Sequence, residues 1–303
     1  MNHDYFIVLP DRKVRLKDYD PKYTGKFKHK DDAAQKLTED VESLSALQDV
    51  LYAQDQQALL IIFQAMDAAG KDSAIKHVMS GVNPQGCQVV SFKTPSAEEL
   101  DHDYLWRCMK NTPERGRIGI FNRSYYEEVL VVRVHPEFLR TQKIPPDLTG
   151  KKLWQRRFDQ INEYERYLTE NGMRIIKFFL HVSFDEQRKR FLERIEKPEK
   201  NWKFSAADVR ERSHWKEYMN AYEEMFQHTS TPWAPWYIIP ADRKWFTRIV
   251  VADIIVETLR SMNLHYPKPD AEHLAGLEES RRALLDEDKQ LPSTTSSSSE
   301  KST

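Results

Sequence analysis

A short stretch near residue 60 has the residue types of a phosphate-binding loop. The apolar run 59–63 has the length of a buried strand, and it is followed by small residues, by Gly70-Lys71 and by a helix-compatible pattern. In a P-loop, backbone N–H groups and the positive end of the next helix face an anion, and the lysine reaches a terminal phosphoryl group. The predicted phosphate-binding residues of this loop are Ala68, Ala69, Gly70, Lys71, Asp72 and Ser73.

The stretch departs from the pattern G-x-x-x-x-G-K-[ST] at two positions. Ala65 stands in place of the first glycine, and Asp72 stands in place of the hydroxyl residue that holds magnesium in a standard P-loop. Asp67, inside the loop, is the natural replacement ligand because a hard cation prefers carboxylate oxygen. The alternative is a plain strand–turn–helix junction in which Gly70 only permits the turn, since Gly-Lys after a strand also occurs by chance.

A second group of polar residues follows the apolar run 117–121. Asn122 occupies the position at which a Walker B aspartate would hold magnesium. Arg123 comes next, at the expected carboxyl edge of a sheet, where a guanidinium is well placed to pair with phosphate. Arg133, flanked by valines, suits a partly buried cation that meets an anion. For each arginine, a structural salt bridge to a nearby glutamate is the alternative.

The elements that must position these residues alternate between strand and helix patterns. Strand-like runs lie at 59–63, 87–92, 117–121, 173–182 and 236–240. Helical patterns lie at 31–54, 96–111, 153–169, 215–226 and 244–262. This alternation indicates an α/β fold with a parallel sheet flanked by helices, in which ligands bind at the carboxyl ends of the strands.

Residues 184–212 have the composition of a helical lid. One basic helix is interrupted at Lys197-Pro198, and a second begins after Ser205. Arg190 and Arg194 are four residues apart, so they share a helix face and are predicted to bind phosphate. The alternative is a solvated basic stripe. Two aromatic lid residues are candidates for stacking on a nucleotide base: Trp202 and Phe204.

The two ends of the chain have a different composition from its middle. Residues 1–30 are predicted to be a polar N-terminal arm, either solvated or lying as a basic segment over an anionic substrate or a neighbouring subunit. Residues 31–270 are predicted to be the P-loop domain, with the lid at about 184–212. Residues 271–303 form a tail that is expected to be largely disordered from about residue 285, where Ser, Thr and Lys predominate.

Composition limits the partners and the compartment. The 303-residue chain has 46 basic and 47 acidic residues, so no global field favours nucleic acid or a membrane surface. No apolar run approaches the roughly 20 residues that span a bilayer, and no signal peptide is recognised. Cys87 and Cys108 have no metal-site spacing and fit free thiols in a reducing cytoplasm.

Three motifs together resemble one family. They are Gln-Ala-Met-Asp-Ala-Ala-Gly-Lys-Asp at 64–72, Phe-Asn-Arg-Ser-Tyr-Tyr-Glu at 121–127 and Lys-Pro-Glu-Lys-Asn-Trp-Lys-Phe at 197–204. They look like the polyphosphate kinase family 2 proteins, and the similarity runs from about residue 15 to 265. The resemblance implies a thymidylate-kinase-like P-loop fold with a mobile lid. It also implies a need for Mg²⁺ and phosphoryl transfer between inorganic polyphosphate and a nucleotide.

Family roles can be carried over residue by residue. Asp67 matches the loop carboxylate that coordinates Mg²⁺, Lys71 the phosphate-binding lysine and Arg123 the arginine after the Walker B strand. Most members have aspartate where this chain has Asn122, and many have asparagine where it has Glu127. That combination is similar to the third class, whose members phosphorylate nucleoside monophosphates and diphosphates. Asp67, Asn122 and Glu127 are therefore the expected metal ligands, with Glu127 supplying the missing carboxylate charge.

The resemblance extends to the lid and to assembly. Asp208 matches an acidic lid position, and the family implies a homo-oligomer, a dimer or a tetramer. The expected reaction moves phosphoryl groups from polyphosphate to AMP, ADP or other nucleoside mono- and diphosphates. The expected catalytic residues are Asp67, Lys71, Arg123, Glu127 and Arg133. Two alternatives stay open: an ATP-dependent nucleotide kinase on the same fold, and a non-catalytic protein that binds nucleotide or polyphosphate.

Overall fold

A five-stranded parallel sheet forms the core of the protein. The computed structural model describes residues 1–150 and 152–290. The strands are β1 (Ala58–Gln64), β2 (Cys87–Ser91), β3 (Ile118–Asn122), β4 (Met173–His181) and β5 (Trp236–Pro240). Their order in the sheet is β2-β3-β1-β4-β5, and every neighbouring pair is parallel. The predicted α/β class is therefore confirmed.

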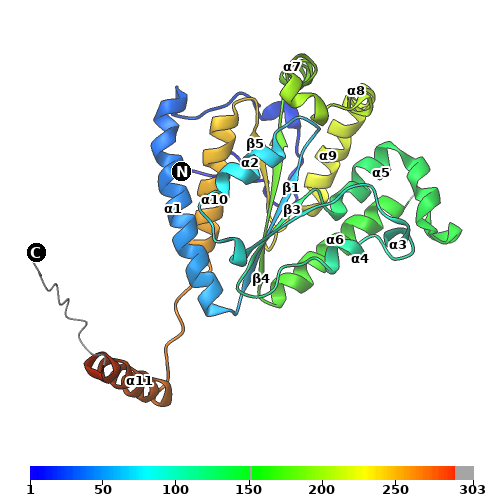
Figure 1. The fold of residues 1–303 in the computed structure, drawn as a ribbon. Coiled ribbons are helices and arrows are strands. Elements are labelled where there is room, and N and C mark those ends of the chain that lie inside the picture. Colours follow the sequence, from blue (N-terminus) through cyan, green and yellow to red (C-terminus); the bar gives the residue numbers. More distant parts are fainter. Residues whose placement is uncertain (151, 291–303) are drawn as a thin grey trace, which may run out of the picture. The chain divides into compact units, whose positions relative to one another are not determined.

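Helices cover both faces of this sheet (Figure 1). On one face α1 packs against α10, which also contacts α2, and on the other face α6 packs against α9. The longer helices are α1 (Lys30–Gln54), α2 (Lys71–Val78), α6 (Leu153–Glu170), α7 (Phe184–Glu196), α8 (Ala206–Ser213), α9 (Trp215–Thr229), α10 (Lys244–Ser261) and α11 (Ala271–Gln290). Three helices of one turn each are α3 (Ala97–Leu100), α4 (Trp106–Met109) and α5 (Val131–Val134).

The central strand β1 brings the candidate residues to one edge of the sheet. All seven of its residues are buried, as expected for a strand with neighbours on both sides and helices on both faces. Phe63 of β1 is paired with Asn122 of β3, so the two strands end side by side. The loop at 65–70 and the turn after β3 therefore leave the sheet at adjacent points.

The prediction of a single helix at 96–111 is wrong, because the structure has two short helices in this range. Ser96 caps α3 through a capping box with Glu99. The Asp103 side chain then accepts a hydrogen bond from the N–H of Leu105 at 2.9 Å. Such a local side-chain bond offers the backbone an alternative to the helix, and it separates α3 from α4.

The first residues are not the polar arm that the sequence indicated. Phe6, Val8 and Val14 are buried in the main core. The N–H of Val8 donates to Trp236 O at 2.9 Å, and the N–H of Ile238 donates to Phe6 O at 2.8 Å. This segment covers the outer edge of β5, which would otherwise be an unpaired strand edge open to wrong pairing.

The C-terminal residues from Tyr266 onward form a second unit, separate from the unit Met1–His265. Its described part is α11, which continues to Gln290 although disorder was expected from about residue 285. Alanine, leucine, glutamate and arginine predominate in this stretch, and they are strong helix formers. Residues 291–303, the rest of the predicted disordered tail, lie outside the described residues. No helix in the described ranges is long and apolar enough to cross a membrane.

Truncating Phe6 tests the packing of the N-terminal segment. Its ring is 2% exposed and lies 6.3 Å from the ring of Phe246 in α10. We expect Phe6→Ala to lower the free energy of unfolding by about 3–5 kcal/mol, because it removes a buried aromatic and leaves a cavity. Leu9→Ala, at a half-exposed side chain, is the matched control and should change it by less than about 0.5 kcal/mol in urea unfolding. Equal effects of both changes would show that the segment is not packed.

Candidate active site

The loop between β1 and α2 has the backbone geometry of a phosphate-binding turn. Ala68 and Gly70 both have positive φ, of 61° and 111°. The value at Gly70 is one that side-chain-bearing residues rarely adopt, so glycine permits the turn into α2. The N-terminal end of α2 then follows directly at Lys71, which places unpaired helix N–H groups and a positive dipole end beside the loop.

A cleft of about 440 Å³ opens over this loop. It is lined by residues 67–73, by Asn122 at the end of β3 and Arg123 after it, and by Arg190 and Arg194 from α7. All the loop residues predicted to bind phosphate therefore share one cavity. Of the other predicted residues, those that do not line it are Glu127, Arg133, Trp202, Phe204 and Asp208.

Lys71 lies at the bottom of the cleft with its side chain folded back onto the loop. Its Nζ donates to Ala65 O at 3.0 Å, and 9% of the residue is exposed. Burial, and then the nearby charge of Arg123, together lower the pKa of Lys71 to about 8. The cation is therefore poorly solvated, and a phosphate in the cleft would offer it a better partner than one carbonyl.

Arg123 joins the loop after β1 to the turn after β3. Its guanidinium donates to Asp67 Oδ1 at 2.5 Å and to Glu127 Oε2 at 2.9 Å. Glu127, then Asp67, keep the pKa of Arg123 above its usual range despite burial. The salt bridge weighed as an alternative is thus present, yet Arg123 also lines the cleft. The catalytic roles expected for Asp67, Lys71 and Arg123 stay predictions.

The three expected metal ligands do not face a common point. Asn122 lines the cleft, and its amide donates to Asp72 Oδ1 at 2.7 Å. Glu127 instead lines a separate cavity of about 30 Å³, and Asp67 borders both spaces. Arg123 lies between them because Glu127 is one turn further along the chain and pairs with its guanidinium.

The oxygen donors that do share the cleft fit a hard divalent cation. Asp67 supplies a carboxylate and Asn122 an amide oxygen. No group of three or more His, Cys, Asp or Glu that could hold a metal gathers within the described ranges. A cation that keeps several waters and is shared with substrate phosphates needs only one or two protein carboxylates, as Mg²⁺ does.

Arg190 is not available as the phosphate ligand that the sequence indicated. Its Nε donates to Glu186 at 2.9 Å, one terminal nitrogen donates to Ala68 O and Ala69 O, and the other to Ala241 O and Asp242 O. These contacts use all five N–H groups of a guanidinium. Arg190 therefore fastens α7 to the loop, and it is buried for that reason.

Gln187, one turn before Arg190, has a similar role that the sequence did not reveal. Its amide donates to Asp67 O at 2.9 Å, and its own carbonyl accepts from Arg212 of α8 at 2.8 Å. The only sequence signal was its position on the same helix face as Arg190. Both ends of the lid are thus linked to the loop through one side chain.

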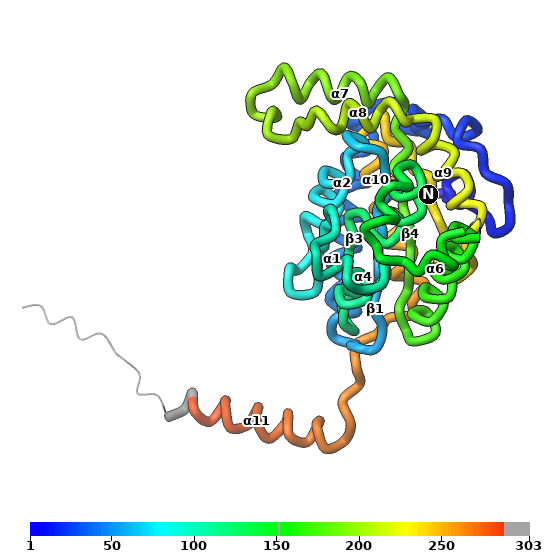
Figure 2. Tube along the Cα trace, turned by 90° about the vertical axis from the view of Figure 1, so that its right-hand side faces the viewer, coloured from blue at the N-terminus to red at the C-terminus, as the bar shows by residue number. Residues whose placement is uncertain are grey.

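The lid projects from the sheet as α7 and α8 (Figure 2), connected by the 3₁₀ segment Pro198–Lys203. Arg194 lines the cleft and contacts Asp208 Oδ2 at 3.4 Å, so the predicted acidic lid residue holds a predicted phosphate ligand. Burial, then the charge of Asp67, raise the pKa of Asp208. Trp202 is 78% exposed, and neither Trp202 nor Phe204 lines the cleft, so neither is placed to stack on a base there.

Arg133 lies in α5, away from the cleft. Its guanidinium pairs with Glu224 of α9 and lies over the ring of Trp154, 5.6 Å from its centroid. Of the two interpretations of Arg133, the structure shows the alternative, a salt bridge to a glutamate. The partner is 91 residues away in the sequence, so a local pattern gave no sign of it.

Sequence reasoning missed four lysines that line the cleft. Lys93 follows β2, Lys200 and Lys203 belong to the lid, and Lys244 begins α10. Lys200 pairs with Glu193, whereas the ammonium groups of Lys93 and Lys244 contact no acidic partner within 1–150 and 152–290. The position of Lys93 directly after a strand was the available signal, since ligands collect at the carboxyl ends of parallel strands.

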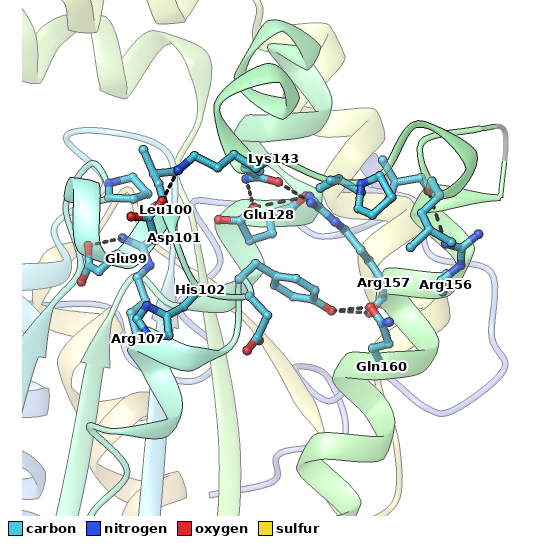
Figure 3. Close-up of a pocket in the computed structure, with 18 residues that line it drawn as sticks. Glu99, Leu100, Asp101, His102, Arg107, Glu128, Lys143, Arg156, Arg157 and Gln160 are labelled. Carbon is cyan, nitrogen blue, oxygen red and sulfur yellow. Dashed lines mark hydrogen bonds and ion pairs between the residues drawn. The ribbon is translucent and has the colours of Figure 1, made fainter.

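Figure 3 shows a second cavity, of about 390 Å³, which the segment after β2 also borders. Ser91, Phe92 and Lys93 line the cleft, while Pro95 lines this cavity. Tyr104 donates to Gln160 at 3.1 Å. Lys143 reaches across the exposed rim to pair with Asp101 (Figure 3).

Buried charges form one wall of this second cavity. Glu128 accepts from Gln142 at 2.6 Å and from Arg157 at 3.3 Å, and Arg157 lies over the ring of Tyr104. Burial raises the pKa of Glu128 although Arg157 opposes the shift. The wall is therefore preorganised, with aromatic and charged groups that offer both stacking and hydrogen bonds.

The parallel sheet, the loop at 65–70 and the basic lid over it define a P-loop phosphotransferase. The model of the family described as polyphosphate kinase 2 matches residues 27–267. The chain belongs to the polyphosphate kinase 2 family, and the family and fold predicted from its motifs are confirmed.

Relatives and solved structures agree with this assignment. The chain is 52% identical over 281 residues to the ADP-polyphosphate phosphotransferase of Rhodopseudomonas palustris, covering 92% of this chain and 97% of the relative. It is 45% identical over 264 residues to the AMP/ADP-polyphosphate phosphotransferase of Meiothermus ruber, covering 87% and 95%. The crystal structure of polyphosphate kinase 2 from Arthrobacter aurescens superposes with a TM-score of 0.82 at 37% identity, covering 93% of this chain and 98% of that one.

The lowered pKa of Lys71 predicts pH-dependent binding of anions. Lys71 is charged below about pH 8 and neutral above it, so it attracts phosphate less as the pH rises. We expect the affinity for inorganic tripolyphosphate, measured by calorimetry without metal, to fall across pH 7.5–9.5 by about tenfold. In Lys71→Arg the fall should disappear, because a guanidinium keeps its proton throughout this range. The same pH dependence in both proteins would contradict the assignment to Lys71.

Proposed function

We propose that this enzyme transfers phosphoryl groups from inorganic polyphosphate to AMP and ADP in the presence of Mg²⁺. The observation that carries the proposal is that the segment 91–95 borders two cavities: a cation-lined cleft over the P-loop and a mixed aromatic and charged pocket. The names of the relatives from Rhodopseudomonas palustris and Meiothermus ruber support the same reaction.

The P-loop cleft suits the polyanionic donor. Beyond the loop it is lined by Arg194, Lys200, Lys203 and Lys244. Burial, and then the positive charge of Arg190, lower the pKa of Lys244. Lys244 is also the first residue of α10, where the positive end of the helix dipole repels a cation. Such mutual repulsion is relieved by an extended chain of phosphates, which carries charge along the whole row.

The second cavity suits the acceptor nucleoside. Its volume lies within the range of small-molecule sites, and its walls combine Tyr104 with Arg157, Glu128 and Gln160. A nucleoside in this pocket would direct its phosphate past Pro95 toward Lys93 and the P-loop. The donor and the acceptor would then meet at Lys71 from opposite sides.

The chemistry requires positioning and neutralisation of charge. An acceptor phosphate already carries a nucleophilic oxyanion at neutral pH, so no strong general base is needed. Lys71 and Arg123 would spread the negative charge that builds up on the transferred group. Asp67 and Asn122 would hold Mg²⁺, which would supply positive charge to neutralise the phosphates. Glu127 would act on Arg123 by fixing its orientation.

Incubation of AMP or ADP with long-chain polyphosphate tests the reaction. We expect ATP to appear from both acceptors with Mg²⁺, and transfer to stop when EDTA removes the metal. Lys71→Ala should slow single-turnover transfer by about a hundredfold, on the order of 3 kcal/mol in the barrier, while the protein stays folded. ATP as the preferred donor would indicate an ordinary nucleotide kinase, and binding without turnover would indicate a sensor protein.

Lys93→Ala tests the route between the two cavities. We expect the KM for AMP to rise about tenfold, because one charge-assisted contact to phosphate is lost, while the KM for polyphosphate changes by less than twofold. Lys110→Ala is the matched control, since that lysine is exposed over the ring of Trp106 and lines neither cavity. A rise in the polyphosphate KM instead would place Lys93 on the donor side.

We propose further that the enzyme acts in the cytoplasm as a homo-oligomer, a dimer or a tetramer. Cys87 and Cys108 are free thiols, which is compatible with a reducing compartment. Light scattering on the purified protein measures the oligomeric state directly. A monomer at micromolar concentration would contradict the proposed homo-oligomer.

A further inference from the structure

A buried polar network lies beneath the turn that carries Arg123 and Glu127. We use this name for Tyr125, Tyr126, Glu165, Lys177 and the carbonyl of Thr229. All five residues are 0% exposed. They come from four elements: the 3₁₀ segment Tyr125–Val129, α6, β4 and the end of α9. None of them lines the P-loop cleft or the second cavity.

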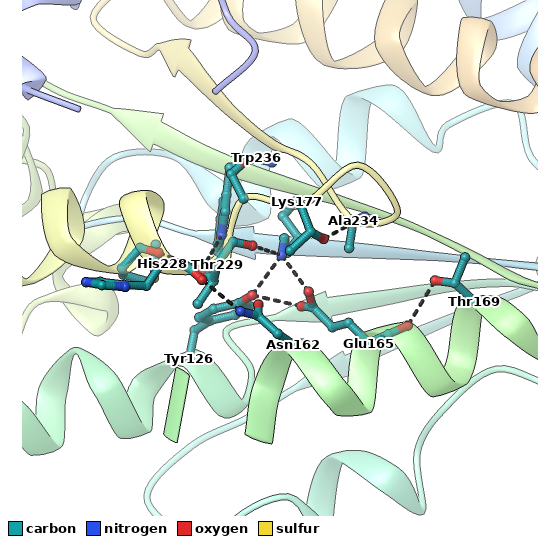
Figure 4. A network of polar contacts seen from close by, with 12 residues as sticks. Tyr126, Asn162, Glu165, Thr169, Lys177, His228, Thr229, Ala234 and Trp236 are labelled. Atoms are coloured by element: carbon teal, nitrogen blue, oxygen red, sulfur yellow. Dashed lines mark hydrogen bonds and ion pairs between the residues drawn. The ribbon is translucent and has the colours of Figure 1, made fainter. Parts of the chain in front are cut away.

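Every charged or hydroxyl group of this network has partners (Figure 4). Lys177 Nζ donates to Glu165 Oε2 at 2.6 Å, to Thr229 O at 2.7 Å and to the Tyr126 hydroxyl at 2.8 Å. These are the three donors of an ammonium group. Glu165 Oε1 accepts from the hydroxyl groups of Tyr125 and Tyr126, each at 2.8 Å. A fully satisfied network in a low-dielectric interior is rigid.

Stability of the fold does not explain why charges lie here. An ion pair buried this deeply loses its hydration, and apolar side chains of the same volume commonly stabilise a protein as well or better. The network does, however, fix the orientation of two consecutive tyrosines. Those tyrosines directly precede Glu127 and follow Arg123 by two and three positions.

The other end of the same turn is held by β1. Arg123 has a left-handed backbone with φ of 65°, and its N–H donates to Phe63 O at 3.0 Å. Gln64 donates to Glu127 Oε1 at 2.8 Å when its amide nitrogen faces the carboxylate. Arg123 and Glu127 therefore sit between two anchors, one on β1 and one in the buried network.

From this geometry we propose that Glu165 and Lys177 are positioning residues of the phosphotransferase. Through the tyrosine hydroxyl groups they hold the turn so that Arg123 points at Asp67 and into the cleft. The inference rests on the proposed role of Arg123 in transfer. Neither Glu165 nor Lys177 contacts the reacting groups; they act through Tyr125 and Tyr126.

Removal of one hydroxyl group tests the tether. Tyr126→Phe keeps the ring and its packing but breaks the bonds to Lys177 and Glu165. We expect kcat to fall about tenfold, because a small displacement of a catalytic group is costly in rate, with the KM for AMP changed by less than twofold. Tyr125→Phe, which loses one bond, and Glu165→Gln, which keeps the shape of the side chain, should lower kcat in the same direction.

Tyr164→Phe is the matched control. The Tyr164 ring lies 5.6 Å from that of Tyr125, and its buried hydroxyl has no hydrogen-bond partner within the described ranges. The same chemical change, made next to the network but outside it, should leave kcat unchanged. Thermal unfolding of all variants confirms that each remains folded at the assay temperature, and if Tyr126→Phe does not, Tyr125→Phe takes its place.

A second background separates positioning from general damage. The Arg123→Lys variant has no bidentate guanidinium for the network to orient. Adding Tyr126→Phe to this variant should therefore lower kcat by less than twofold. An equal tenfold loss in both backgrounds, or full kcat in Tyr126→Phe alone, would overturn the positioning role. Full activity of Arg123→Lys by itself would instead refute the proposed role of Arg123.

Discussion

The bridge from Arg123 to Asp67 and Glu127 is the contact on which the site depends. It ties the loop after β1 to the turn after β3, and these two strands are neighbours in the sheet. One guanidinium thus lies between two carboxylates, one of which also borders the P-loop cleft. Asp67 therefore has two candidate partners, the guanidinium of Arg123 and a divalent cation in the cleft.

The positive charges near the loop divide into two kinds. Arg190 has every N–H group occupied and connects α7 to the P-loop and to the turn between β5 and α10. Lys93 and Lys244 line the cleft without acidic partners among the described residues. A count of cations in the sequence cannot separate these kinds, because the difference lies in which acceptors the fold brings within hydrogen-bonding distance.

Much of the fold could be read from the sequence because its signals are local. The strand at 59–63, the glycine at the loop, the basic lid and the last strand are each defined by neighbouring residues, and the structure has them within one or two positions. The loop residues also share one cleft, as their spacing indicated. The exceptions are instructive: Asp103 interrupts a predicted helix with a single side-chain bond, and Phe6 is buried by a strand edge some 230 residues further on.

The sequence by itself determined the family, the α/β class and the position of the P-loop, because these follow from residue types at short spacing. The tertiary structure alone decided what each charge does. In the fold, Arg133 forms an ion pair with Glu224, and the donors of Arg190 are all engaged by other acceptors. Asn122 and Glu127 line different cavities. Lys177 forms a buried ion pair with Glu165. Long-range partners decide the role of a polar side chain, since a charge is stabilised by whichever groups surround it in space and not by those beside it in the chain.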